Sequence, residues 1–177
     1  ITPEYQVYRG ILARELKYYE SNVPHTLIVY QSELGALSYI DYDLKKDSNV
    51  EDFGSLTDGT YMPSPYIAQD IALGSFGGTV YVFQLGFNSG YDLVVARVPV
   101  KTNGVFTEFV DFDDVPVTTF TNVSLWNDVT EPFEITNTIY DGTDNSLIIF
   151  VKREDDASHF ILKLAIDTTT ITWFVES

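Results

Sequence analysis

The feature that most constrains the fold is a pattern of short apolar runs that recurs three times and is punctuated by turn residues. Each recurrence pairs a wholly apolar run with a second run in which apolar and polar residues alternate; the apolar runs follow Thr26, Thr79 and Ser146. Val, Ile, Thr, Tyr and Phe dominate these runs, and these residues are enriched in β-strands. The clusters between them contain Gly, Asn, Asp and Pro, which provide positive φ angles or side-chain bonds to the backbone. The pattern predicts an all-β protein.

Alignment of the runs predicts a single module of three units, each with four strands. The units cover approximately residues 11–54, 66–112 and 133–177, and segment 113–132 is a candidate insertion. Tandem four-stranded antiparallel sheets are typical of β-propeller blades. Since three blades do not close a ring, such an arc would expose apolar faces at both ends. We favour a propeller-like segment, with a β-sandwich as the alternative, because sandwiches also consist of short, regularly spaced strands.

The strands of one unit are expected to differ in burial. The apolar runs, at 27–30, 80–83 and 147–150, are interpreted as inner strands covered on both faces by neighbouring blades. The alternating runs, at 37–44, 92–100 and 159–166, are expected to be covered on one face. At the N-terminus, Tyr5, Tyr8, Leu12 and Leu16 have helical spacing, whereas alternation from Ile11 onward predicts a strand. Periodicity leaves both open.

Composition excludes several classes of site. The 177 residues carry a formal net charge of −16, contain no cysteine and include only two histidines. A thiolate metal site, a disulfide framework and a cysteine nucleophile are therefore excluded, and a strongly negative chain is unsuited to tight DNA or RNA binding. No apolar run approaches the length that spans a bilayer. The first residue is Ile, which suggests a processed product or a piece of a longer chain.

Carboxylates are the most abundant candidates for chemistry, and they form tight groups in predicted turns. Oxygen-rich turns have the ligand chemistry of Ca²⁺, but their order does not match an EF-hand, and turns with Asx side-chain bonds have the same composition. We therefore expect no metal and no cofactor. Ca²⁺ bound in these turns is the one alternative. The three groups are Asp111, Asp113 and Asp114; Asp141, Asp144 and Asn145; and Asp155 and Asp156.

Catalytic signatures are missing from the sequence: it contains no nucleophile elbow, zinc-binding helix motif or phosphate loop. The glycine-rich stretch 74–78 is interpreted as a turn between strands. Asp41 and Asp43 point to one side of a predicted strand, as an acid–base pair or, as we favour, as an exposed charged face. His25 is expected at the surface and His159 in a cross-strand contact, neither with an orienting partner. The sequence thus predicts no catalytic residues and no enzyme.

Exposed aromatic residues raise an alternative function, because Tyr and Trp rings can stack on sugars. The candidates lie in or near predicted loops: Tyr61, Tyr66, Tyr91 and Trp126. Residues 122–124 form a glycosylation sequon, which is too short to assign a compartment. The alternative is therefore an extracellular carbohydrate-binding or glycoside-cleaving propeller or sandwich, with a host surface glycan as partner. Cleavage would require two carboxylates about 5–10 Å apart.

The third unit and the first unit resemble hairpins of the tail nozzle proteins (tail tubular protein B) of short-tailed bacteriophages. Residues 144–167 are similar to a turn, a Leu-Tyr-Val-Val-Val-x-Arg strand, a loop and a Tyr-Leu-Glu-x-Leu-Asp strand. Residues 16–24 are similar to an x-x-Tyr-x-x-x-x-Pro lead-in, and 37–43 to Leu-x-x-Leu-Thr-Tyr-Asp. The chain departs from the family at 34–35, where Leu-Gly replaces Asp-Gly, and near Phe53, where a Trp is missing.

This resemblance implies a structural virion protein of the phage tail without catalytic activity. Such proteins form a ring, typically of six subunits, that surrounds the DNA-exit channel and joins neighbouring tail components. The implied partners are other copies of the chain and adjacent tail proteins, and DNA would pass without specific binding. A net charge of −16 agrees with that last expectation, since it offers phosphate few partners.

Overall fold

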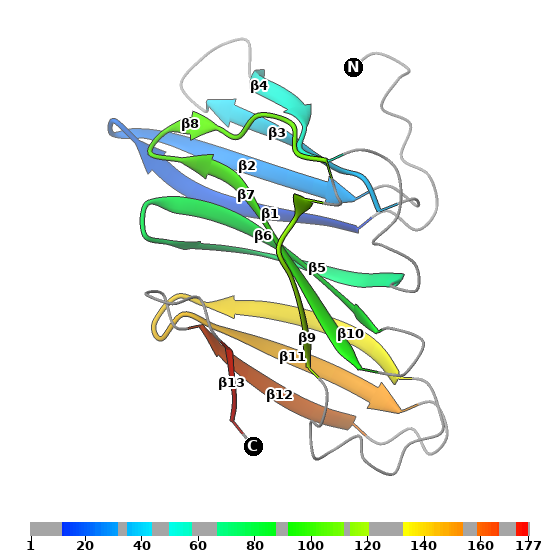
Figure 1. The fold of residues 1–177 in the computed structure, drawn as a ribbon. Helices are drawn as coiled ribbons and strands as arrows, with labels where there is room; N and C mark the ends of the chain where they lie inside the picture. The colour runs from blue at the N-terminus through cyan, green and yellow to red at the C-terminus, as the bar shows by residue number, and fades with distance from the viewer. Residues whose placement is uncertain are drawn as a thin grey trace.

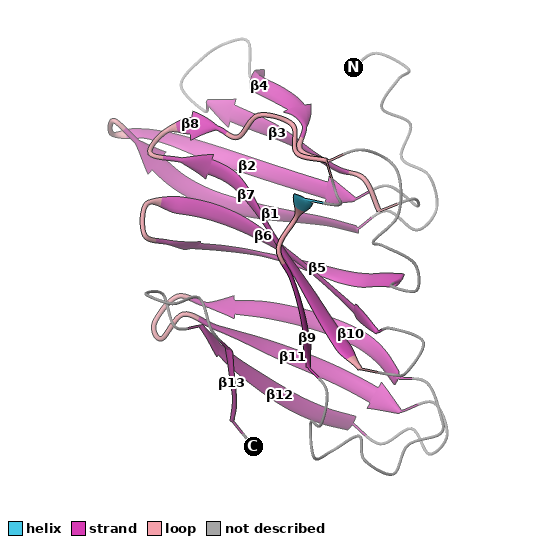
Figure 2. Cartoon of the chain, in the orientation of Figure 1, coloured by secondary structure: helices cyan, strands magenta, loops and turns pink. Residues whose placement is uncertain are grey.

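The computed structural model describes residues 12–31, 35–43, 50–57, 67–87, 92–111, 114–120, 133–153, 159–166 and 173–176. Most of these residues lie in antiparallel β-strands (Figure 2), which confirms the all-β prediction. In the described part of the chain, no helix is long and apolar enough to cross a membrane.

The strands are organised in three sheets that are stacked one on another (Figure 1). The first sheet has the order β1-β2-β3-β4, with strands Leu12–Glu20, Val23–Gln31, Leu37–Asp43 and Val50–Ser55. The middle sheet has the order β5-β6-β7-β8, with strands Ile67–Phe76, Thr79–Phe87, Leu93–Thr102 and Val105–Phe106. The third sheet has the order β10-β11-β12-β13, with strands Phe133–Asp141, Ser146–Arg153, His159–Ile166 and Trp173–Glu176.

Strand β9, Val117–Phe120, lies inside the predicted insertion 113–132 and pairs with β7 of the middle sheet. Strand β7 is long enough to pair with β9 over Leu93–Ala96 and with β8 at its other end. The described part of the insertion therefore extends the middle sheet.

Two-residue turns close three of the hairpins. Both central residues have positive φ in each turn: Ser21 and Asn22, Gly77 and Gly78, and Asn103 and Gly104. Positive φ at both positions is the geometry whose twist matches paired antiparallel strands, and Asn and Gly adopt it most readily. Within stretch 74–78, residues 74–76 thus belong to β5 and residues 77–78 form the turn.

The core consists of two apolar clusters, one on each face of the middle sheet. Leu27 and Val29 of the first sheet pack with Val82, Val94 and other residues of the middle sheet. The opposite cluster joins residues of the middle sheet to the third sheet, among them Phe83, Leu85, Leu147, Ile149 and Leu162. The first strands β1, β5 and β10 lie next to one another along one side of the stack. The first and third sheets are at opposite ends of an open arrangement (Figure 1).

Burial differs from the sequence expectation because the burial of a strand depends on which sheet it belongs to more than on its place within the four-stranded unit. Among the described residues, only the middle sheet is covered on both faces, so β6 and also the alternating run in β7 are buried on both sides. The runs in β2 and β11 are buried on one face only. The expectation that all apolar runs are covered on both faces was therefore wrong for 27–30 and 147–150. The expectation of one covered face was wrong for 92–100.

The contested N-terminal segment is a strand from residue 12 onward. Leu12, Leu16 and Tyr18 face the middle sheet, while intervening residues such as Lys17 are exposed. This alternation is that of a strand with one covered face. Residues 1–11, which include the start of the helical alternative, lie outside the described residues.

Candidate functional site

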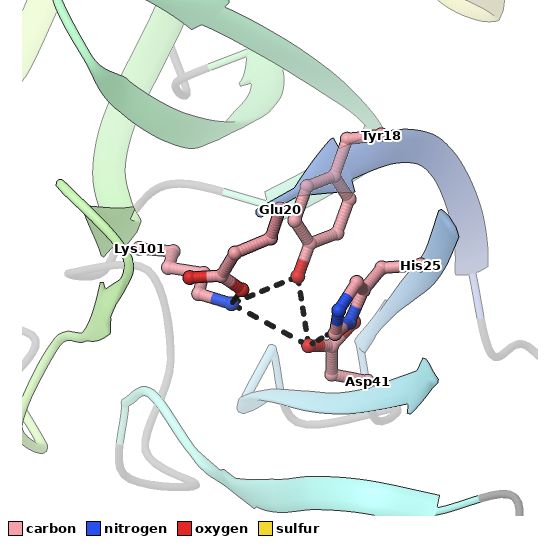
Figure 3. Close-up of polar contacts among 5 residues, drawn as sticks. All are labelled: Tyr18, Glu20, His25, Asp41 and Lys101. Carbon is pink, nitrogen blue, oxygen red and sulfur yellow. Dashed lines mark hydrogen bonds and ion pairs between the residues drawn. The ribbon is translucent and has the colours of Figure 1, made fainter. Parts of the chain in front are cut away.

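A cluster of five polar side chains lies between the first and middle sheets (Figure 3). Tyr18 and Glu20 come from β1, His25 from β2, Asp41 from β3 and Lys101 from the end of β7. Alternation along β3 directs Leu37, Tyr39 and Asp41 to the same inward face, which brings a carboxylate into the apolar interface.

Short contacts connect all five members of the cluster. The Lys101 ammonium donates to Glu20 Oε2 at 2.6 Å and to the Tyr18 hydroxyl at 2.9 Å. The Tyr18 hydroxyl in turn donates to Asp41 Oδ2 at 2.7 Å. That oxygen also lies 3.2 Å from His25 Nδ1 and 3.5 Å from the Lys101 ammonium. One carboxylate oxygen of Asp41 is thus the common partner of three side chains.

Burial makes these interactions strong and mutually dependent. The side chains of Asp41 and Lys101 are only 1% and 6% exposed, and Glu20 is the most accessible charged member. The ammonium also lies 4.5 Å from the Phe106 ring centroid, where the negative face of the ring attracts a cation. A charge buried in this way is destabilising unless it is paired and hydrogen-bonded. The cluster satisfies that condition for its lysine.

The His25–Asp41 pair resembles the arrangement by which a carboxylate orients a catalytic imidazole. In such an enzyme the imidazole must also reach a substrate. Here the His25 side chain is 7% exposed, its ring stacks on Tyr18, and the cluster faces the adjoining sheet. This geometry is suited to holding two sheets in register.

A second buried ion pair links the first strands of the sheets. The Arg14 guanidinium of β1 binds Asp70 Oδ1 of β5, which also accepts the backbone N–H of Ile71 at 2.9 Å. Burial raises the pKa of Asp70 above its ordinary value of 3.8. The Arg14 charge, the Ile71 N–H and contacts from Thr138 of β10 oppose that shift. The carboxyl therefore lies where β1, β5 and β10 meet.

An amide pair forms a third polar link between the first and middle sheets. The fully buried Gln84 of β6 donates to Gln31 Oε1 of β2 at 2.7 Å and lies 3.0 Å from the Gly35 carbonyl oxygen. The amide is a neutral counterpart of the two ion pairs, since it connects the same two sheets without a buried charge.

The structure corrects two predictions about these residues. Asp41 is buried with a relative exposure of 0%, so it is no part of an exposed charged face; the side chain of Asp43 lies outside the described residues. His25 is buried and has an orienting carboxylate, contrary to its prediction as a surface residue without a partner. His159 begins β12, is exposed, and lies opposite Lys152 of β11.

Sequence reasoning missed Lys101, Tyr18, Arg14 and Asp70 as members of buried networks. For Asp41 and Asp70, a usable signal was present, because each interrupts an apolar strand at a position that alternation directs inward. For Lys101 there was none, since a lysine that ends a strand beside Asn-Gly normally marks an exposed turn.

The acidic turn at 141–145 closes the β10–β11 hairpin. Asp141 Oδ1 accepts the Thr143 backbone N–H at 2.8 Å, which is an Asx turn. Asp144 accepts the Ser146 hydroxyl at 2.6 Å and pairs with the Lys163 ammonium at 2.5 Å. The hydrogen bonds with Lys163 and Ser146 lower the pKa of the Asp144 carboxyl. Both carboxylates therefore bind partners in the same turn or on the adjacent strand β12.

The remaining predicted candidates are dispersed. Asp111 and Asp114 are exposed, whereas Asp113, Asp155 and Asp156 lie outside the described residues, as do the sequon and the aromatic candidates Tyr61, Tyr66, Tyr91 and Trp126. Within the described ranges, no three His, Asp or Glu side chains come together in a way that could hold a metal ion.

Comparisons with protein-family models, with curated proteins and with solved structures find no match to this chain.

Proposed function

We propose that this chain is a structural virion protein that acts without catalysis. In this proposal it forms part of a phage tail nozzle ring, lines the DNA-exit channel and joins neighbouring tail components. Its partners are other copies of itself and adjacent tail proteins. The hairpin resemblance of units one and three to tail nozzle proteins supports the phage assignment.

The observation that carries the proposal is the construction of the stack. The middle sheet is buried on both faces. At its interface with the first sheet, the buried charges of one sheet pair with those of the other. Side chains committed to such contacts hold a shape, because each lost partner would leave a buried charge uncompensated. A scaffold under mechanical load requires this rigidity.

The charge of the chain supports passage of DNA without retention. A net charge of −16 repels the phosphate backbone, whose binding to proteins relies on Lys and Arg. Among the described basic residues, Arg14, Lys17, Arg97, Lys101 and Lys163 already contact acidic or aromatic side chains of the same chain. We expect no binding of duplex DNA at physiological salt in fluorescence polarisation.

The decisive experiment is quantitative mass spectrometry of purified phage particles from a host that produces this protein. We expect the chain in a constant whole-number ratio to the portal protein, and in tail complexes released from the head. Detection only outside the particles, or a ratio that varies between preparations, would contradict the proposal. Glycan-array binding by the purified chain would instead favour the carbohydrate-binding alternative.

A further inference from the structure

The side chains of Lys101 and Asp41 meet between the first and middle sheets (Figure 3). The Lys101 Nζ atom lies 3.5 Å from Asp41 Oδ2, and both side chains are almost completely buried. Of the described lysines, only Lys101 is buried. An amine nitrogen and a carboxyl group are therefore held together away from water, which is the condition under which two bound groups react fastest.

A second carboxylate and two hydrogen-bonding side chains complete the arrangement. Glu20 Oε2 lies 2.6 Å from the Lys101 Nζ atom, so it is placed to accept a proton from the ammonium. The Tyr18 hydroxyl donates to Asp41 Oδ2 at 2.7 Å, and His25 Nδ1 lies 3.2 Å from the same oxygen. The nitrogen thus has a proton acceptor, and the carboxyl oxygen has neighbours that stabilise it as a leaving group.

The other oxygen of Asp41 favours a neutral product at this place. Oδ1 is buried and accepts no hydrogen bond from the described residues. A bare oxygen on a buried carboxylate is costly, whereas the carbonyl oxygen of an amide carries no net charge. We propose that Lys101 and Asp41 form an intramolecular isopeptide bond, which joins β7 of the middle sheet covalently to β3 of the first sheet.

The bond forms by condensation with loss of one water. The ammonium gives one proton to Glu20, and the freed electron pair of Lys101 Nζ attacks Asp41 Cγ. The new C–N bond forms, the bond from Cγ to Oδ2 breaks, and its electron pair stays on Oδ2. That oxygen leaves as water, with the proton held by Glu20 and a second proton from Nζ, while Oδ1 becomes the amide oxygen. Nothing is oxidised or reduced, and no co-reactant is consumed.

Two other ion pairs of the described chain lack what this reaction requires. Arg14 and Asp70 are close together, but a guanidinium stays protonated and is not a nucleophile. Lys163 and Asp144 are 32% and 42% exposed, so water reaches both groups.

Glu20 is closer to the Lys101 nitrogen than Asp41 is, but its side chain is 34% exposed. We therefore assign Glu20 as the proton acceptor and Asp41 as the carboxyl group that is joined. The partly exposed side of Glu20 also gives the released water a way out. The bond goes beyond the proposed function and does not depend on the phage assignment.

The test is the mass of the full purified chain, held folded overnight and then denatured for mass spectrometry. We expect most molecules to be lighter than the sequence by the mass of one water. After trypsin digestion, peptide 18–45 should be joined to peptide 98–152, because trypsin does not cleave after a lysine whose amine is in an amide. Fragmentation of the joined peptides should place the bond on Lys101 and Asp41.

Two variants separate the covalent bond from the ion pair. Lys101→Arg keeps the cation but lacks the amine, so it should retain the full mass. A succinimide at residues 141–142 would also lose one water, but that loss would persist in Lys101→Arg. Glu20→Gln should slow the loss of water about a hundredfold, because it removes the proton acceptor. Glu15→Gln, on the same strand and exposed, is the matched control. Circular dichroism melting checks that each variant is folded.

Two results for the wild-type chain would overturn the inference: the full mass without joined peptides, or a bond that fragmentation places on Glu20. An unchanged rate of water loss in Glu20→Gln would overturn the role assigned to that carboxylate. These results are separate from the particle experiment. Absence from virions would remove the tail assignment and leave the bond standing, whereas presence in virions of a chain with its full mass would do the reverse.

Discussion

The two interfaces inside the stack are built from different chemistry. Between the first and middle sheets, the apolar cluster is interrupted by buried charges and amides, with Asp41, Lys101, Gln31 and Gln84 among them. Between the middle and third sheets, the core cluster is aliphatic and aromatic, and the polar contacts of Gln69 and Asp70 with β10 lie beside it. Ring contacts there run from Phe76 through Tyr81 and Phe83 to Tyr140, with centroid separations of 4.6, 6.2 and 6.1 Å.

This difference shows two ways to fix how sheets stack. Apolar burial is roughly proportional to area and has little directional preference, so the second interface depends on shape. The Tyr140 ring fits closely against Gly74, since an added Cβ at Gly74 would lie 2.5 Å from that ring. The first interface depends on pairing, because a shift of one residue would separate Lys101 and Asp41 from their partners. Polar pairing selects a register more strictly, whereas apolar packing contributes more stability.

The largest expected effect comes from breaking the charged pairing. Lys101→Met keeps the length and most of the volume of the side chain but leaves the Asp41 and Glu20 carboxylates without their shared cation. We expect a loss of about 3–5 kcal/mol in the free energy of unfolding, the effect of removing one partner of a buried pair. Urea denaturation monitored by tryptophan fluorescence measures it.

A second substitution makes that test specific for the pair. Adding Asp41→Asn to Lys101→Met removes the buried charge and should recover a large part of the lost stability. If the double variant is as unstable as the sum of the two single variants, Lys101 and Asp41 are not energetically coupled, and the register argument for the first interface fails.

The shape-dependent interface is tested by Gly74→Ala. The methyl group would overlap the Tyr140 ring, whose hydroxyl lies 2.6 Å from Asn145 Oδ1 and 3.2 Å from the Ser75 carbonyl oxygen and which therefore cannot move freely. We expect a loss of about 1–3 kcal/mol from overpacking. Gly142→Ala is the control: its Cβ would make an ordinary 3.6 Å contact with the same ring, and its effect should stay below about 0.5 kcal/mol.

Asp70 contacts residues of both interfaces, and its titration should make the stability of the stack depend on pH. Its pKa is raised by burial, so between the unfolded value of about 3.8 and the raised value the folded state holds more protons than the unfolded state. The contribution of Asp70 to the free energy of unfolding should therefore fall as pH rises through this window. Asp70→Asn cannot titrate, so its stability relative to wild type should increase over the same range.

Urea titrations at closely spaced pH values between about 3.5 and 7 measure this difference. A difference between variant and wild type that is constant over the whole range would show that Asp70 titrates as an exposed carboxyl. That result would remove it from the buried junction of the three sheets.

The smallest expected effect separates buried from exposed lysines. Lys17 lies on the outward face of β1, is 75% exposed, and is 3.9 Å from Glu15. Lys17→Ala should change the free energy of unfolding by less than about 0.5 kcal/mol, as is usual for exposed ion pairs. A loss of free energy of unfolding comparable to that of Lys101→Met would mean that burial does not determine how much a lysine contributes to stability.

Local residue chemistry made part of this architecture predictable. Pairs such as Asn103-Gly104 and Gly77-Gly78 favour the positive φ angles of tight hairpins, and β-branched and aromatic runs between such turns favour strands. Both signals are short-range, so the all-β class could be derived from the chain alone. The Leu12–Glu20 segment was ambiguous, because its apolar residues fit two periods at once, and contact with the middle sheet made it a strand.

The candidate site was less predictable than the fold. Asp41 and Lys101 are distant in sequence and come from different sheets, and nothing in their local surroundings indicates a meeting partner. His25, beside a proline and near a turn, has the sequence context of a surface residue and is nevertheless buried. Long-range pairing of charges depends on how the sheets stack, and local propensity contains no information about that.

The amino-acid sequence by itself determined that this protein consists of antiparallel strands in successive hairpins, because turn formation and alternation act over a few residues. Only the tertiary structure decided which sheet is covered on both faces, which charges meet in the interior and which apolar faces remain outward. Burial is set by the neighbours of a strand in space, and those neighbours are chosen by packing over the whole chain.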